Sequence, residues 1–152
     1  MKSVMTHDFS RIAQTDAPRS TFDRSHGLKT AFDSGYLVPI EVQEVLPGDT
    51  VEMDAAFLGR TAPTVTPIMD NVFFDTQWFF VPSRIIWNNF TKMMGERVNP
   101  NDSIDYLVPQ LNSGNGFAVG SLADYFGIPT GVKNLDVNIL PFRAYAKIWD
   151  DW

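Results

Sequence analysis

The sequence predicts a mainly β fold with short helices. Three segments, residues 36–45, 50–58 and 71–81, alternate apolar and polar side chains with the period of two that strands require. Ten glycines and ten prolines divide the 152 residues into short elements, which excludes a long-helix bundle or a coiled coil. Hydrophobic residues make up 44% of the chain, enough for a packed core.

The three predicted strands differ in their expected surroundings. Residues 36–45 contain Pro39, which favours an edge strand or a bulge. A Pro-Gly-Asp turn at residues 46–49 leads into residues 50–58, so these two strands form either a hairpin or a corner between two sheets. Residues 71–81 (NVFFDTQWFFV) are the most aromatic, and we expect this strand to be central and buried on at least one face.

A helical pattern follows the aromatic strand. We expect Ser83 to cap a helix that runs to about Met94, because large apolar residues recur there along one face. Gly95 is a typical residue for the end of such a helix. Residues 96–120 are rich in turn-forming residues and are predicted to form loops.

The last third of the chain is predicted to hold two helices and a strand. Residues 121–126 form a short capped helix that ends at Gly127, and residues 134–139 a brief strand. A final helix over residues 140–152 places large apolar side chains on one stripe: Phe142, Tyr145, Ile148, Trp149 and Trp152. Because that pattern has no stop signal, we expect the chain to be cut short of its natural end.

Residues 1–34 are predicted to form an extended arm that precedes a body of residues 35–152. The first thirty residues carry five basic and three acidic groups, whereas the rest carries seven basic and fifteen acidic groups, for a total of −6. A basic extended segment with interleaved phenylalanines suits single-stranded nucleic acid. A solvated tail, or ion pairing with an acidic neighbouring subunit, is an equally open interpretation. The basic candidates are Arg11, Arg19, Arg24 and Lys29.

The sequence offers no pattern typical of catalysis or of metal binding. Cysteine is absent, and the two histidines, His7 and His26, lack acidic residues at metal-ligand spacing. Neither a nucleophile elbow nor a phosphate-binding loop occurs. Glu41 and Glu44 are interpreted as a solvated strand face rather than as an acid and base pair. The sequence therefore predicts that the protein is not an enzyme. We expect it to have no catalytic residue and to bind neither a cofactor nor a metal ion.

No apolar run approaches the ~20 residues of a membrane helix, and the first residues lack the apolar stretch of a secretory signal. We therefore expect that the protein does not associate with a membrane. We also expect that it is made inside the cell.

Six motifs in a fixed order carry a family resemblance. They are RSH at residues 24–26, FDSGYLVP at 32–39, EVLPGDT at 44–50, PIMDN at 67–71, WFFVPSR at 78–84 and LPFRAY at 140–145. Together they resemble the N-terminal part of the major capsid protein of microviruses, most similar to the gokushovirus-like branch. The resemblance runs from about residue 18 to residue 152.

The resemblance implies a viral jelly roll of two packed antiparallel sheets, about eight strands in all, which this chain leaves incomplete. It implies a structural subunit that self-assembles into a T=1 icosahedral shell packaging circular single-stranded DNA. The protein would then be part of the virion, assembled in the host bacterial cytoplasm beside other capsid subunits. Other virion or scaffolding proteins remain open as partners. The arm around Arg24, Ser25 and His26 would lie near the inner surface, against DNA or neighbouring subunits.

Two other classes of protein remain open from the residues alone. A carbohydrate-binding β-sandwich module would be a monomer with its aromatic side chains in a surface row. A sandwich-fold hydrolase would need two carboxylates about 5–10 Å apart across a cleft.

Overall fold

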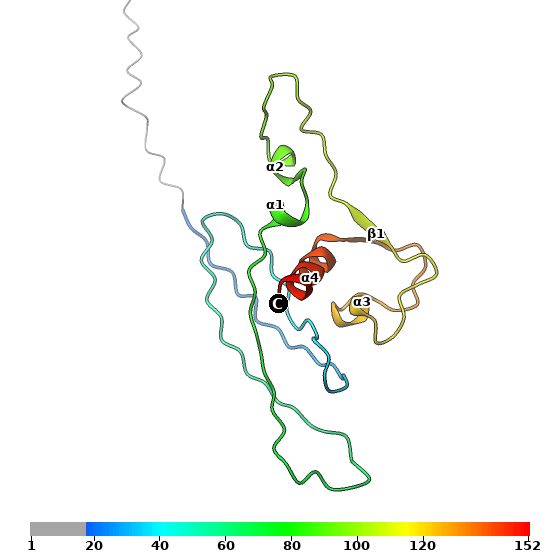
Figure 1. Ribbon diagram of the computed structural model, residues 1–152. Coiled ribbons are helices and arrows are strands. Elements are labelled where there is room, and N and C mark those ends of the chain that lie inside the picture. The colour runs from blue at the N-terminus through cyan, green and yellow to red at the C-terminus, as the bar shows by residue number, and fades with distance from the viewer. Residues whose placement is uncertain (1–17) are drawn as a thin grey trace, which may run out of the picture.

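The computed structural model describes residues 18–152 (Figure 1). It contains little helix and one small antiparallel sheet, which is compatible with a mainly β protein. The elements, in chain order, are α1 (Ser83–Ile86), α2 (Phe90–Met93), β1 (Gln110–Asn112), α3 (Leu122–Tyr125), β2 (Asp136–Asn138) and α4 (Leu140–Asp151). All of them lie after residue 82, so the described chain divides into an extended first part and a folded second part.

The three segments predicted as strands before residue 82 form no strand among the described residues. Residues 36–45, 50–58 and 71–81 are extended but join no ladder of hydrogen bonds. Alternation of side chains decides which of them share a face, but a strand forms only against a neighbour that accepts and donates backbone hydrogen bonds. No described segment forms such hydrogen bonds with them. The predicted burial of the aromatic strand is also wrong, since Phe73 and Phe80 are each 81% exposed.

The turn at residues 46–49 is confirmed. The amide of Asp49 donates to the carbonyl of Leu46 over 3.1 Å, and the Asp49 carboxylate accepts from the Leu46 amide over 3.1 Å. Gly48 takes φ +86° at the third position, the conformation that a Pro-Gly turn of this type demands. The chain therefore reverses here as expected, although no hairpin extends from the turn.

The helix predicted from Ser83 to Met94 is two helices, α1 and α2, separated at Trp87. Trp87 has extended dihedral angles (φ −149°, ψ 109°), and its side chain is buried against Phe90 with ring centroids 6.4 Å apart. The two asparagines that follow Trp87 are poor helix formers, and burial of the large Trp87 ring also favours the break between the two helices. Ser83 does not cap α1, because the N-cap residue is Pro82. Gly95 ends α2 as predicted, with φ +98°.

The small sheet pairs β1 with β2, placing Leu111 opposite Val137. The strand within residues 134–139 was predicted, whereas β1 lies inside residues 96–120, which were predicted to be loop only. Ser113 closes the end of the sheet: its hydroxyl donates to the Val132 carbonyl over 2.8 Å and accepts from the Leu135 amide over 2.9 Å. A side chain thus replaces ladder bonds that three-residue strands are too short to supply.

Two glycines permit a close approach beside this sheet. A Cβ atom on Gly116 would lie 2.7 Å from the Cα and carbonyl carbon atoms of Gly131, closer than packed atoms come. Gly116 also has φ +107°, where a side chain is strained. The bridge between Phe117 and Thr130 follows directly from this approach. The loops around the sheet are therefore specified by glycine and by hydrogen bonds.

Helix α3 is capped as the sequence predicts. The Asp124 amide donates to the Ser121 hydroxyl over 3.4 Å, and the Asp124 carboxylate accepts from the Gly120 amide over 2.8 Å. This reciprocal pair satisfies two donors at the start of the helix. Gly127, with φ +78°, ends it.

Helix α4 is also confirmed, and it connects the separate parts of the fold (Figure 1). Phe142 and Tyr145 pack against Phe126, just after α3, with ring centroids 5.0 and 6.4 Å apart. Arg143 donates to the carbonyl of Ile86 at the end of α1 over 3.2 Å. The Tyr145 hydroxyl donates to the carbonyl of Leu37 over 2.7 Å, which ties the extended first part to the helix.

The predicted apolar stripe of α4 is buried at one end only. Phe142, Tyr145 and Ile148 are half-buried, whereas Trp149 and Trp152 are exposed. Trp152 meets Phe79 edge-on with ring centroids 5.9 Å apart.

Candidate nucleic-acid interface

The arm of residues 18–34 presents three of the predicted basic side chains to solvent. Arg19, Arg24 and Lys29 are exposed on an extended backbone, so their charges can reach phosphate groups without unfolding anything. Arg11, the fourth candidate, lies outside the described residues, as does His7. Because Arg19, Arg24 and Lys29 follow one another at intervals of five residues, a fully extended arm spaces these three by about 17 Å.

Aromatic rings accompany these charges. Phe22 and Phe32 lie within the arm and Tyr36 directly after it, and all three rings are exposed. A nucleic-acid base stacks on such a ring irrespective of its sequence. This segment therefore carries exposed basic side chains and exposed aromatic rings together.

Acidic groups in the arm moderate its charge. The Asp23 carboxylate accepts hydrogen bonds from the Ser25 hydroxyl and the Ser25 amide over 2.5 and 2.9 Å. These two bonds, the hydroxyl first, lower the pKa of Asp23 below its ordinary value, so this carboxylate stays charged. With Asp33 it offsets part of the positive charge of the arm, whose attraction for phosphate is consequently modest.

His26 has two partners in the structure. Its Nδ1 lies 2.9 Å from the carbonyl oxygen of Arg24, and its Nε2 lies 2.5 Å from a carboxylate oxygen of Glu41. Both partners only accept hydrogen bonds, so the doubly protonated ring alone satisfies both. The Arg24 carbonyl first, and then Glu41, raises the pKa of His26 above its ordinary value. His26 thus fastens the arm to residues 36–45.

The Glu41 partner was missed by the sequence reasoning, which had placed Glu41 on a solvated face. Its side chain is in fact only 21% exposed and faces His26. Fifteen positions separate the two residues on segments without periodic pairing, so no local pattern in the sequence signals the contact. The contact of Tyr145 with Leu37 was missed for the same reason.

Three further observations concern only residues 18–152. No three side chains of the metal-ligating types gather there into a group. Every buried side-chain nitrogen or oxygen atom in that range has a hydrogen-bond partner. None of the helices there combines the length and apolar character needed to cross a bilayer.

Residues 10–152 match the family model described as capsid protein (F protein). The chain therefore belongs to this family of phage capsid proteins.

Three curated relatives agree with the family assignment, and each is named capsid protein VP1. The relative from Bdellovibrio phage phiMH2K is 46% identical over 147 residues, 96% of this chain and 28% of the relative. The relative from Chlamydia phage 1 is 44% identical over 159 residues, 100% of this chain and 27% of the relative. The relative from Spiroplasma virus 4 is 39% identical over 155 residues, 99% of this chain and 28% of the relative.

The resemblance to microvirus capsid proteins, drawn from six short motifs, is confirmed by these matches. The chain spans a little over a quarter of the length of the curated relatives it matches. Membership of a capsid family indicates a structural role.

Proposed function

We propose that this protein is a structural, non-enzymatic capsid subunit that assembles with other capsid subunits into a T=1 icosahedral shell around circular single-stranded DNA. The shell would form in the cytoplasm of the bacterial host and become the virion. The family match over residues 10–152 carries the proposal, together with 39–46% identity to three phage and virus capsid proteins.

The proposed architecture is a jelly roll that this chain begins. Residues 1–34 form the arm, and residues 35–152 supply the first strands and insertions of a domain that further polypeptide completes. The coverage of 27–28% of the relatives supports this proposal. The three extended segments have the alternation of strands, and each would gain a ladder once neighbouring strands are present.

The space between the extended segments fits the same proposal. Most of residues 19–62 and all of residues 72–78 border an open hollow of about 3480 Å³, together with Thr64, Ile68, Tyr125, Trp149 and Trp152. Small-molecule sites occupy about 300–1000 Å³, so the hollow is too large and too open for such a ligand. Its size and its apolar rings suit several packed strands instead.

The arm is proposed to contact the packaged DNA or a neighbouring subunit. The residues proposed for these contacts are Arg11, Arg19, Arg24, His26 and Lys29. The exposure of Arg19, Arg24 and Lys29, interleaved with exposed rings, supports a role in binding a single strand. His26 would act through its bond to Glu41, which holds the arm in place.

Electron microscopy of the purified full-length protein tests the shell. We expect closed icosahedral particles of uniform size. Monodisperse monomers at high concentration, with no particles, would contradict the proposed function.

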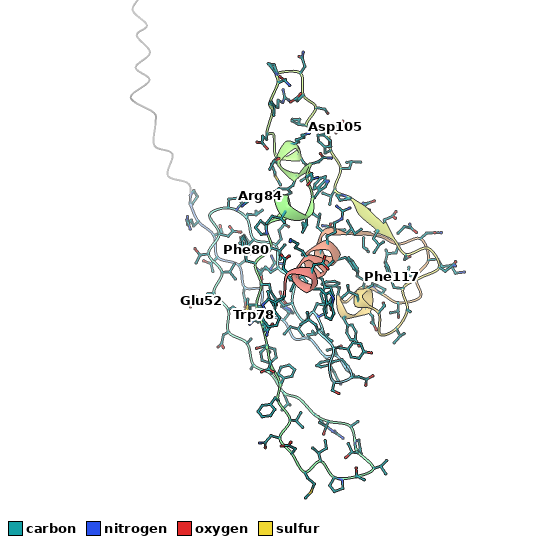
Figure 2. The ribbon with its side chains drawn as sticks, viewed as in Figure 1. Glu52, Trp78, Phe80, Arg84, Asp105 and Phe117 are labelled. Atoms are coloured by element: carbon teal, nitrogen blue, oxygen red, sulfur yellow. The ribbon has the colours of Figure 1, made fainter. Side chains whose placement is uncertain are left out.

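The proposed contact between the arm and DNA is tested separately, by removing basic side chains from the arm. Arg19→Ala with Arg24→Ala should lower the DNA content of purified particles. The difference from the unsubstituted protein should be largest at low salt, because the variant neutralises fewer phosphates and its binding depends less on salt. Arg84→Ala with Arg97→Ala is the matched control, since both side chains are also exposed but lie outside the arm, Arg84 on α1 (Figure 2). Particles with unchanged DNA content would show that the arm does not hold the genome.

The sugar-binding alternative is weaker than the capsid proposal. Residues 72–81 do carry exposed aromatic side chains, including Trp78 and Phe80 (Figure 2). A sugar platform needs rings fixed on a rigid surface, however, and these rings stand on backbone without a ladder. The family assignment favours covered rather than ligand-binding rings.

A further inference from the structure

One asparagine of the chain, Asn115, is followed directly by glycine, Gly116. Asparagine before glycine readily loses its side-chain amide, because glycine has no Cβ atom to hinder its backbone nitrogen from reaching the asparagine side chain. Both residues lie in a turn that leaves β1 and ends at Phe117, which is labelled in Figure 2. Asn115 is exposed there, so water reaches it freely.

The folded turn holds this reactive pair in an unreactive arrangement. The Gly116 amide donates to the carbonyl of Ser113 over 2.9 Å, which keeps the proton on the nitrogen that would attack. Gly116 also lies against Gly131, so closely that a Cβ atom on it would stand 2.7 Å from the Gly131 backbone. The nitrogen can therefore turn toward the Asn115 side chain only after the turn opens.

Several further hydrogen bonds hold the turn closed. The Ser113 hydroxyl donates to the Val132 carbonyl over 2.8 Å and accepts from the Leu135 amide over 2.9 Å. On the other side of the turn, the Gly131 amide donates to the Phe117 carbonyl over 3.0 Å. A reaction that needs a locally opened state follows the population of that state. The strength of these bonds therefore sets the rate of any reaction between Asn115 and its neighbour.

We propose that Asn115 is a modification site, at which spontaneous deamidation takes place when the turn after β1 opens. The Gly116 nitrogen gives its proton to water and attacks Cγ of Asn115. The N–Cγ bond forms, the Cγ–Nδ2 bond breaks, and the leaving nitrogen takes up a proton and departs as ammonia. Water then opens the five-membered ring at either carbonyl, giving aspartate or isoaspartate without any oxidation or reduction. The inference is independent of the proposed capsid function, since it rests on the turn alone.

The isoaspartate product makes the opening of the turn permanent. Its main chain runs through the side chain of residue 115, which lengthens the turn by one methylene group. Gly116 then cannot keep both its hydrogen bond and its place against Gly131. The Gly131 amide, which donates to the Phe117 carbonyl in the unmodified protein, should exchange faster with solvent in the modified protein.

Peptide mass spectrometry of the purified full-length protein, incubated in water enriched in ¹⁸O, tests the proposal. Deamidation at Asn115 incorporates one ¹⁸O atom, and electron-transfer fragmentation distinguishes isoaspartate from aspartate. A synthetic peptide of residues 109–121 gives the rate without the fold. We expect conversion in the protein at a rate about tenfold or more below that of the peptide, because several hydrogen bonds must first break. Equal rates would show that the turn does not control the reaction and would overturn the proposal.

Ser113→Ala tests the control by the turn. This variant lacks both hydroxyl hydrogen bonds, so conversion at Asn115 should be about tenfold faster. Ser103→Ala is the matched control, since its hydroxyl also accepts from an amide, that of Asp105 over 3.1 Å, but outside the turn. Its rate should stay within about twofold of the unsubstituted protein. Asn112, which is followed by serine, should stay unmodified in every variant.

The remaining outcomes decide the proposal. An unchanged rate in Ser113→Ala, with the amides of α4 exchanging as in the unsubstituted protein, would overturn the control by the turn. Absence of ¹⁸O at Asn115 in both proteins after the peptide has converted would overturn the modification site itself. Slow exchange of the Gly131 amide in the isoaspartate form would show that the turn closes again, contrary to the proposal.

Discussion

The two parts of the described chain are held in different ways. Residues 18–81 contain a single backbone-to-backbone hydrogen bond, the one that closes the turn between Leu46 and Asp49. Residues 82–152 contain every helix and strand, together with caps, bridges and loop bonds. The difference does not follow apolar content, because the first part holds the most aromatic segment of the sequence, residues 71–81.

Range of interaction explains the difference. A helix, a cap or a glycine turn is satisfied by residues a few positions away, so residues 82–152 acquire their structure from their own neighbours. A strand needs a partner that lies far along the chain or in another molecule. Residues 18–81 have the sequence of strands without such a partner among the described residues, and their rings stay exposed.

The largest expected effect comes from breaking the folded part at its closest backbone approach. Gly116→Ala places a Cβ atom 2.7 Å from Gly131 and also strains a residue at φ +107°. We expect the free energy of local unfolding around β1 and β2 to fall by about 3 kcal/mol. Amide hydrogen exchange in these strands measures it, and exchange in residues 18–81 should not change.

Gly120→Ala is the control for backbone strain alone. Gly120 has φ +75°, yet nothing lies within 4 Å of the place where its Cβ atom would stand. Gly120→Ala should lower the free energy of local unfolding by about 1–2 kcal/mol, which is the energy that a residue with a Cβ atom needs to adopt the left-handed conformation. Equal losses at the two glycines would show that the approach to Gly131 contributes nothing.

Sequence reasoning succeeded where structure is local. Ser121, Gly127 and Gly48 were assigned their roles from turn and cap chemistry, and the structure confirms each. It failed where partners are distant: β1 was missed because its three residues are recognisable only beside β2. The helix from Ser83 was predicted as continuous because the pattern shows an apolar stripe but not the extended backbone and the burial of Trp87.

An intermediate effect on stability is expected when the hydrogen bond between α4 and the extended part is removed. Tyr145→Phe removes the hydroxyl that donates to the Leu37 carbonyl over 2.7 Å. Partial burial raises the pKa of Tyr145, so the hydroxyl keeps its proton and donates at all ordinary pH values. Loss of this hydrogen bond should lower the free energy of local unfolding of the extended part by about 1 kcal/mol. Limited proteolysis within residues 36–45 should then be faster, and cleavage within residues 106–139 should not change.

Tyr125→Phe provides the comparison for that tie. Tyr125 is also half-buried, but it lies on α3, and the Leu37 carbonyl accepts its hydrogen bond from Tyr145 instead. Proteolysis of residues 36–45 should keep its original rate in this variant. Equal acceleration in both variants would show that the extended part is held by something other than the Tyr145 hydroxyl.

The candidate interface was predictable in composition but not in geometry. Spacing of Arg19, Arg24 and Lys29 along an apolar-poor segment predicted an extended basic arm, and the structure exposes all three. The sequence could not predict that His26 meets Glu41, because that contact depends on how two unpatterned segments pass each other.

The smallest expected effect concerns this His26 contact and lies wholly within the extended part. The pKa of His26 is raised above its ordinary value of 6.5, so its bonds to Arg24 and Glu41 stabilise the arm fully below pH 6.5. That stabilisation is lost as the pH rises through the raised pKa. In an NMR titration His26 should titrate above 6.5, and Glu41→Gln should lower its midpoint. Glu44→Gln, on the same segment but without contact to His26, should leave it unchanged. A midpoint insensitive to Glu41→Gln would mean that the arm is not fastened to residues 36–45 in solution.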